Sequence, residues 1–423
     1  MSMKNEPRAV AGAAVMALLI AGCGSNPAPR PVMAHGVAVR EPLVNPRPYG
    51  TADAAFGLDV LGAVCQSDPR SNLVLSPSSL ASGLGMAYLG ARGGTARAMA
   101  KALRLPAAGG PGLQAGLQAR SAALRGLGSP GVTLAASDQV WADPALPPEP
   151  TYLNAVATGY GAGLAKAPLL KDPELARQEI NQAIASATRG QIPQLLAPGS
   201  LDDHIGWVLT DALYLHAAWA TPFDPDATSP GSFTTAAGRT VTAQFMLGDD
   251  YRAVTADGWT AVWLPYRGGK LGMEALLPPP GSAGCALPGA AALGAMTSRL
   301  ASGQPGALIR GVSFPKVNLA TQVSMKPVLS RLGMGVAFTP AADFTGLSPQ
   351  ACCIGLVEHA ATLDVGEKGT VASAATAVGM QASAAHVAQS PLVTFDRPYL
   401  MVVTDRATGE PLFMARVADP SRS

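Results

Sequence analysis

The chain has 423 residues, with 48% hydrophobic and 14% charged side chains and a formal net charge of +2. This apolar content excludes a disordered chain, and the near-neutral charge gives no electrostatic basis for nucleic-acid binding. Segment 112–128 has only two basic residues, Arg120 and Arg125, so control by a bound polyanion is not expected.

The N-terminus has the features of an export signal, expected over residues 1–22. Lys4 and Arg8 precede an apolar run, 9–22, which is too short to span a bilayer comfortably and is typical of a signal peptide. The run ends in Leu-Ile-Ala-Gly-Cys, which resembles a bacterial lipobox with Cys23 as the lipidated residue. We therefore expect a protein anchored by lipid to the bacterial membrane, facing the periplasm or the cell surface. The alternative is an ordinary secretory signal cut nearby.

Residues 23–50 are expected to form a tether between the lipid and a globular body. Prolines at 27, 29, 31, 42, 46 and 48 predict a semi-rigid, extended segment. The segment would hold the globular body, 51–423, away from the membrane.

Four further cysteines are present in the expected globular body. Export permits disulfides among Cys65, Cys285, Cys352 and Cys353, but the sequence does not give their pairing. Cys352 and Cys353 are adjacent, and this spacing matches neither a metal site nor a CxxC redox motif. This favours small, buried apolar thiols over a switch.

The predicted elements follow one another from helices to strands. Apolar residues at helical spacing predict a helix over 51–65, and Ser76 followed by Pro77 predicts a capped helix that begins there. A third helix is expected over 173–188, with Gly190 as its stop. Strands are expected at 205–217, 271–277, around 361–365, and as a hairpin of 399–404 and 411–417. This order predicts an α+β protein.

The sequence contains no catalytic constellation. Its five histidines, at 35, 204, 216, 359 and 386, form neither HExxH nor a Cys/His zinc spacing. Serine-nucleophile motifs and phosphate-binding glycine motifs are also missing. We therefore expect a protein that is not an enzyme and that needs no metal or cofactor.

Short motifs recur in a fixed order along the chain. The segment 72–95 begins Asn72-Leu-Val-Leu-Ser-Pro-Ser-Ser and includes Ser76 and Ser79. The later motifs are Ile180-Asn181, 188–192, 209–214, Trp219, Pro222-Phe223, Phe314-Pro315-Lys316, 332–334, Phe338, 342–344, His359-Ala360-Ala361, Glu367-Lys368-Gly369-Thr370, 396–399, 412–413 and Asp419-Pro420. Together they resemble the serpin family over residues 52–420.

The resemblance implies a fold of three β-sheets and about nine helices in one monomeric domain, with an exposed reactive loop at about 367–395. Two scaffold positions depart from the family pattern. Asp211 stands where asparagine is common, and Ala415 stands where glycine is common. These departures bear on packing and not on the fold.

The resemblance also implies a mechanism, which is suicide inhibition of a protease. The protease cuts the loop, and the cut loop then inserts as a central strand of the largest sheet. Insertion excludes proline and inward charges. No proline lies between 369 and 389. The hinge begins at Glu367 and includes Gly369. The alternating inward set is small or apolar and free of formal charge: Thr370, Ala372, Ala374, Thr376, Val378, Met380 and Ala382.

The reactive bond is expected about sixteen residues after Glu367, between Ser383 and Ala384. Because the C-terminal side of the loop is longer than common, Met380 and His386 are alternatives. No Arg or Lys lies between 369 and 395, which argues against trypsin-like targets. Small residues favour elastase-like or subtilisin-like serine proteases, and cysteine proteases stay open. The alternative function is a non-inhibitory binding protein of the cell envelope on the same scaffold.

Overall fold

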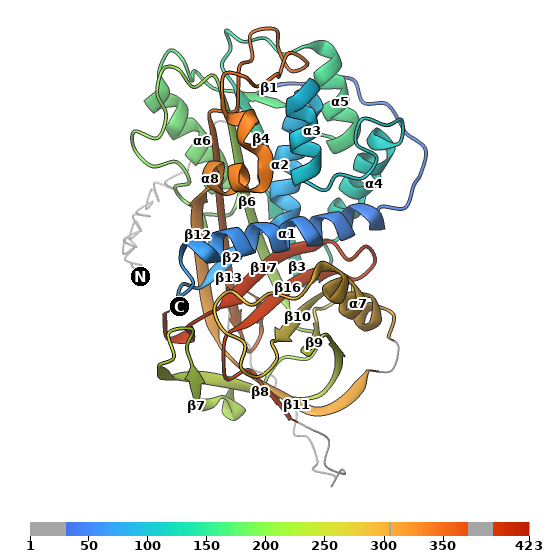
Figure 1. Cartoon of the computed structure of the whole chain (residues 1–423), viewed down its shortest axis with the longest axis vertical. Helices are drawn as coiled ribbons and strands as arrows, with labels where there is room; N and C mark the ends of the chain where they lie inside the picture. The colour runs from blue at the N-terminus through green and yellow to red at the C-terminus, as the bar shows by residue number, and fades with distance from the viewer. Residues whose placement is uncertain (1–30, 304–305, 371–391, 423) are drawn as a thin grey trace, which may run out of the picture.

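The computed structural model describes residues 31–303, 306–370 and 392–422, and these form two β-sheets and eight α-helices. Figure 1 shows the long strands running along the molecule, with helices gathered at one end and α1 crossing the middle. The helices are α1 Arg47–Ser67, α2 Pro77–Gly90, α3 Gly93–Ala102, α4 Leu113–Arg125, α5 Pro150–Tyr160, α6 Pro173–Ala187, α7 Ala290–Ala301 and α8 Met325–Leu329. The α+β class is therefore confirmed.

The first sheet has eight strands in the order β1-β5-β4-β6-β14-β13-β12, with β3 also paired to β6. Its strands are β1 Val32–Ala34, β3 Val132–Ala136, β4 Gln139–Ala142, β5 Leu164–Lys166, β6 Trp207–Ala218, β12 Val317–Ser324, β13 Leu356–Gly366 and β14 Gly369–Thr370. The central strand β6 is buried nearly throughout, as its continuous apolar sequence predicts.

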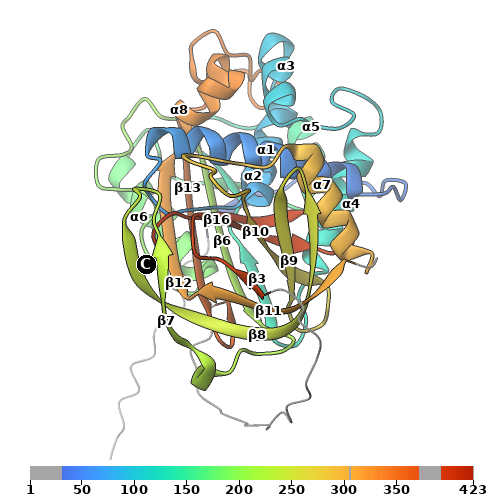
Figure 2. The ribbon, with the colours of Figure 1, turned by 60° about the horizontal axis from the view of Figure 1, so that its bottom comes forward.

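The second sheet has nine strands in the order β15-β11-β8-β9-β10-β16-β17-β2, with β7 paired to β8. Its strands are β2 Leu73–Leu75, β7 Ser229–Thr234, β8 Thr240–Ala256, β9 Trp259–Pro265, β10 Leu271–Leu277, β11 Ala307–Pro315, β15 Leu392–Thr394, β16 Tyr399–Asp405 and β17 Pro411–Val417. Figure 2 shows β8 arching across the end of the molecule that it brings forward.

The resemblance predicts three sheets, but the described residues form two, because β8 is one continuous strand. The first part of β8 pairs with β7, its middle with β11 and its last residues with β9. Hydrogen bonding along β8 therefore joins β7, β11 and β9 into one sheet.

The predicted elements are found close to their expected bounds. The strand expected at 271–277 is β10, and the helix expected to begin after Ser76 is α2, in which the Ser76 hydroxyl accepts a hydrogen bond from the Ser79 N–H at 3.3 Å. The helix expected from 51 begins earlier, at Arg47, with Pro48 in its first turn.

The two sheets pack face to face around a shared core. Leu213 of β6 and Leu363 of β13 belong to one buried apolar cluster with Met273 and Phe413 of the second sheet. A second cluster joins α1 and α2 to the same strands nearer the helical end. The split between β6 and β13 therefore lies directly over the core.

Parts of the segment 31–46 are bound to the body, although most of its side chains are exposed. Strand β1 pairs antiparallel with β5 at the edge of the first sheet. Beyond it, the Val37 and Val39 N–H groups donate to the side chains of Asn154, at 2.7 Å, and Thr158, at 3.0 Å, on α5. This differs from the extended tether predicted over 23–50, because strand pairing and side-chain acceptors satisfy the backbone of a proline-rich segment. Residues 23–30 lie outside the described residues.

A disulfide joins Cys65 at the end of α1 to Cys285, across 220 residues of sequence. The other two cysteines differ from the expectation of buried thiols. Cys352 is exposed and Cys353 is half-buried, with their sulfurs 2.9 Å apart and no disulfide between them.

We expect the variant Cys65→Ser/Cys285→Ser to lose about 2–4 kcal/mol of unfolding free energy, because the disulfide closes a long loop in the unfolded chain. The measurement is the thermal midpoint of the variant beside the wild type, with and without reductant. Reductant should lower the wild-type midpoint and leave the variant unchanged. An equal effect of reductant on both proteins would contradict the prediction.

Glu274 on β10 is fully buried, with one hydrogen bond from the Thr297 hydroxyl at 2.9 Å. Burial raises the pKa of Glu274 from 4.5 to about 7. Because the unfolded chain ionises at lower pH, stability from this group is full below about pH 4.5 and falls as the pH rises towards 7.

We expect Glu274→Gln to stabilise the protein at pH 8 by about 3 kcal/mol and to change little at pH 5. Thermal midpoints at the two pH values check this, with Glu179→Gln as the control on the exposed face of α6. A Glu274→Gln variant that is equally destabilised at both pH values would show that the carboxyl is needed as a neutral hydrogen-bonding group.

Candidate functional site: the hinge between two central strands

The candidate site is the place where the first sheet opens between β6 and β13. These two strands pair in parallel from Val208 and Leu356 as far as Leu213 and Ala361. Beyond this point the short strand β14 lies between them, antiparallel to both, with Thr370 opposite Ala217 and Val365. The chain that follows β13 has therefore already entered the sheet at one end.

Between the two paired ends, β6 and β13 lie apart within the described strands. The intervening residues are 214–216 of β6 and 362–364 of β13. The Thr362 hydroxyl in this stretch is buried and has no hydrogen-bond partner among the described residues.

Thr370 is fully buried, and its hydroxyl lies 2.5 Å from the Tyr266 hydroxyl. The Tyr266 ring is stacked on Trp219, with ring centroids 4.5 Å apart and planes at 4°. Gly369 has φ +145°, and a Cβ there would lie 2.1 Å from the Ala217 carbonyl oxygen. Glycine is thus required where the chain turns into the sheet.

The three successive carbonyls of residues 366–368 accept hydrogen bonds from backbone and indole donors. The Trp219 indole N–H donates to Gly366 at 2.9 Å, the Phe223 N–H donates to Glu367 at 2.8 Å, and the Trp219 N–H donates to Lys368 at 3.0 Å. The start of the reactive segment is therefore fixed to the turn that follows β6.

The Glu367 side chain has two partners. It forms an ion pair with Lys316 at 3.0 Å and accepts a hydrogen bond from the Thr228 hydroxyl at 3.1 Å. Burial raises its pKa, but hydrogen bonds from its own backbone N–H, from Lys316 and from Thr228 outweigh this and lower the pKa of Glu367 below its ordinary value. Glu367 is therefore ionised at neutral pH and anchors the hinge.

His359 of β13 and Asp211 of β6 face each other across the closed part of the sheet. The His359 Nδ1 lies 2.5 Å from an Asp211 carboxylate oxygen, and the His359 Nε2 accepts from the Ser76 N–H at 3.2 Å. Because Nε2 accepts, the ring proton is on Nδ1 and is donated to Asp211. A strand inserted past this point must break the bond between His359 and Asp211.

The predicted residues fall into three groups. The structure gathers Glu367, Gly369, Thr370 and Trp219 at the hinge, and it places His359 and Ser76 at the closed part of the split. Other scaffold residues lie elsewhere: Asn72 accepts from Ala418 and Asp419 at the C-terminus, and Ser79 bonds to Asp138. Outside the described residues lie Cys23, Ala372, Ala374, Thr376, Met380, Ser383, Ala384 and His386.

Tyr266 and Thr228 are hinge residues that the motifs did not indicate. Both come from the second sheet or its connections, and no spacing in the sequence relates them to Thr370 or Glu367. The sequence shows only that Tyr266 directly follows a segment rich in apolar residues, 259–265, and this does not indicate a contact with Thr370.

Comparison with known proteins agrees with this geometry. A family model described as serpin (serine protease inhibitor) matches residues 51–420. The chain is 29% identical over 383 residues to leukocyte elastase inhibitor of Bos taurus, which covers 87% of this chain and 98% of that protein. It is 31% identical over 388 residues to putative serpin-Z6C of Oryza sativa subsp. japonica, and the match covers 85% of this chain and 93% of that protein.

Among solved structures, the native state of the thermophilic serpin tengpin matches with a TM-score of 0.79 at 23% identity, covering 92% of this chain and all of that one. The chain belongs to the serpin family, and its fold is the serpin fold. Within the described residues, no helix is long and apolar enough to cross a membrane, and no cluster of His, Cys, Asp or Glu is placed to bind a metal.

Proposed function

We propose that this protein inhibits serine proteases as a suicide substrate. The observation that carries the proposal is β14, which lies between β6 and β13 with Thr370 buried. Continued insertion in the same direction makes the cut loop a central strand that is antiparallel to both neighbours. The protease, joined to the loop by an acyl bond, moves with the strand and is held before deacylation.

The free energy of the protein is expected to fall when the cut loop inserts between β6 and β13. Successive residues that enter the split form backbone hydrogen bonds alternately to β6 and to β13, each bond worth about 0.5–1.5 kcal/mol net. The entry breaks the bond between His359 and Asp211 and the parallel pairing of β6 and β13 beyond it. The native arrangement is therefore metastable with respect to the form with an inserted loop. Cleavage at a loop bond such as Ser383–Ala384 allows the loop to insert.

We propose elastase-like or subtilisin-like proteases as targets, since the loop offers small residues and no Arg or Lys. The leukocyte elastase inhibitor among the relatives is consistent with this class.

The experiment mixes the full chain with elastase, subtilisin, trypsin and papain. We expect a complex that survives SDS with elastase or subtilisin, and mass spectrometry of the released peptide identifies the cleaved bond. A protease whose catalytic serine is replaced by alanine is the control and should form no such complex.

A thermal scan before and after loop cleavage separates inhibition from simple binding. Insertion of a full strand should raise the midpoint on the order of 10 °C. Clean cleavage with no complex and no rise in the midpoint would favour a non-inhibitory binding protein.

We also propose that Cys23 carries a lipid anchor. Val32 is paired with Lys166 in the first sheet, and the eight residues 24–31 span at most about 29 Å when extended. The inhibitor would then act close to the membrane surface. Detergent partitioning of the wild type and of Cys23→Ser tests this, and partitioning of both into the aqueous phase would contradict it.

A further inference from the structure

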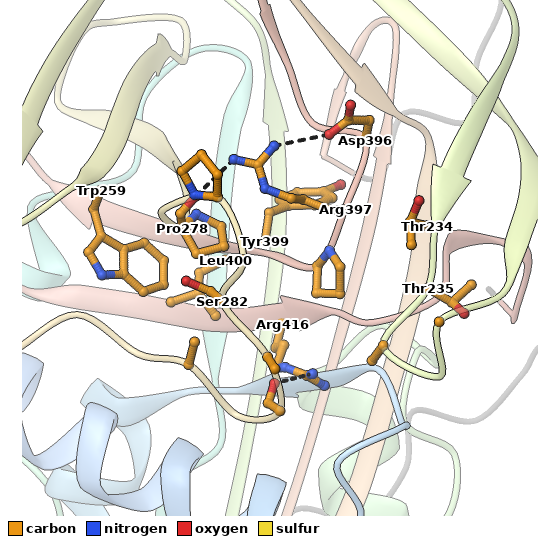
Figure 3. Close-up of a pocket in the computed structure, with 18 residues that line it drawn as sticks. Thr234, Thr235, Trp259, Pro278, Ser282, Asp396, Arg397, Tyr399, Leu400 and Arg416 are labelled. Atoms are coloured by element: carbon orange, nitrogen blue, oxygen red, sulfur yellow. Dashed lines mark hydrogen bonds and ion pairs between the residues drawn. The ribbon is translucent and has the colours of Figure 1, made fainter.

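A cavity of about 460 Å³ shares no lining residue with the hinge and is bordered by two arginines. In the view of Figure 3, Arg397 and Arg416 lie on opposite sides of the cavity, and Trp259 and the pair Thr234 and Thr235 lie on the other two. This volume falls in the range of small-molecule sites.

Arg416 is a buried cation without an acidic partner. Its side chain lies in β17 and is only 2% exposed. The guanidinium donates to two backbone carbonyls, those of Gly284 at 2.9 Å and Ser71 at 3.3 Å, and forms no ion pair with a described carboxylate. Burial lowers the pKa of Arg416, and Asp68 opposes this only from beyond ion-pair distance. A buried guanidinium in this setting is unfavourable until an anion neutralises it.

Arg397 and Tyr399 line the cavity opposite Arg416. The Nε of Arg397 and the hydroxyl of Tyr399 are buried and have no hydrogen-bond partner among the described residues. The remaining Arg397 nitrogens donate to Asp396 at 3.1 Å and to the Pro278 carbonyl at 2.9 Å. Arg397 and Tyr399 thus form the wall opposite Arg416.

Between these polar groups the walls are apolar. Trp259 and Leu400 are buried side chains on β9 and β16, and Pro278, Pro280 and Pro398 complete this surface. One edge is the exposed loop 281–284, which the disulfide between Cys65 and Cys285 fastens to α1. The same fastening positions the Gly284 carbonyl that holds Arg416.

We infer that this cavity binds a small amphipathic carboxylate. The carboxylate pairs with the Arg416 guanidinium, and an aliphatic or aromatic body packs against Trp259, Leu400 and the prolines. A neutral ligand would leave the guanidinium unpaired, and an inorganic anion would leave the apolar walls uncovered. The site is separate from the hinge and does not depend on inhibition.

The test is isothermal titration calorimetry of the full chain with 4-phenylbutyrate and octanoate, beside 4-phenylbutyramide, octanamide and inorganic phosphate. We expect each carboxylate to bind at least tenfold more tightly than its amide and than phosphate. Arg416→Met should abolish this preference, because methionine keeps the apolar stem and removes the charge. Arg104→Met, at an exposed arginine on another face, is the matched control and should bind like the wild type.

Ser282→Trp, which fills the mouth while keeping Arg416, is the second test and should also weaken binding at least tenfold. It keeps the inference testable if Arg416→Met does not fold. Equal binding of carboxylate and amide, phosphate binding as tight as carboxylate, or undiminished binding by both variants would overturn the inference.

Discussion

Replacing Thr370 with arginine is expected to convert the protein from an inhibitor into a substrate. Thr370 is the second residue of β14 and is fully buried, with its hydroxyl 2.5 Å from the Tyr266 hydroxyl. A guanidinium at this position has no acidic partner among the described residues, so β14 should leave the sheet before cleavage. Insertion after cleavage must then bury the charge, at a cost of several kcal/mol. Since each 1.4 kcal/mol slows a step about tenfold, insertion becomes at least about a hundredfold slower, and deacylation releases the protease first. The measurement is the ratio of SDS-stable complex to cleaved protein.

Two variants give this prediction its controls. Val371→Arg adds the same charge at the next position, which alternation places on the outward face, and it should still inhibit. Thr370→Val removes the hydroxyl and keeps the shape, and it should also inhibit. If Thr370→Arg forms complex at the wild-type ratio, the loop does not insert along β6 and β13.

The sequence predicted the hinge better than its surroundings. Gly369 and Thr370 stand out because a neutral, proline-free segment follows them, a property of the chain itself. The contacts that fix the hinge are between segments distant in sequence: Tyr266 with Thr370, and Lys316 with Glu367. Local periodicity does not contain such contacts, so no reading of spacing alone predicts them.

The same limit applies to the fold. Strand β10 and the cap of α2 were predicted closely because apolar runs and capping residues are local signals. The docking of residues 31–46 was missed because prolines indicate an extended chain, and here the partner strand β5 lies more than a hundred residues away. The Cys65–Cys285 pairing joins segments 220 residues apart, which only the packing of the folded chain determines.

Arg120, one of the two basic residues of segment 112–128, is buried in the structure. Its side chain is only 3% exposed, and its guanidinium bonds to Asp53 at 2.7 Å and Glu410 at 2.6 Å. Burial raises the pKa of Asp53 well above its ordinary value, against the lowering effect of Arg120. Although burial opposes it, the two carboxylates raise the pKa of Arg120. This cluster joins α1, α4 and the start of β17.

We expect Arg120→Met to destabilise the protein by about 3–5 kcal/mol at pH 7, because two buried carboxylates lose their only described cation. For a domain of this size that corresponds to a fall of roughly 4–6 °C in the thermal midpoint. The loss should shrink at pH 5, where the unpaired carboxyls are protonated and carry no charge to bury.

Two comparisons separate this effect from lost packing. Arg104→Met breaks an exposed ion pair with Asp59 of similar length, 2.8 Å, and should cost at most about 1 kcal/mol. The triple variant Arg120→Met/Asp53→Asn/Glu410→Gln removes the stranded charges and should recover most of the midpoint at pH 7. If the triple variant is as unstable as Arg120→Met alone at both pH values, the arginine contributes through its packing and its bonds to Ser78 and Ser82, and not through charge.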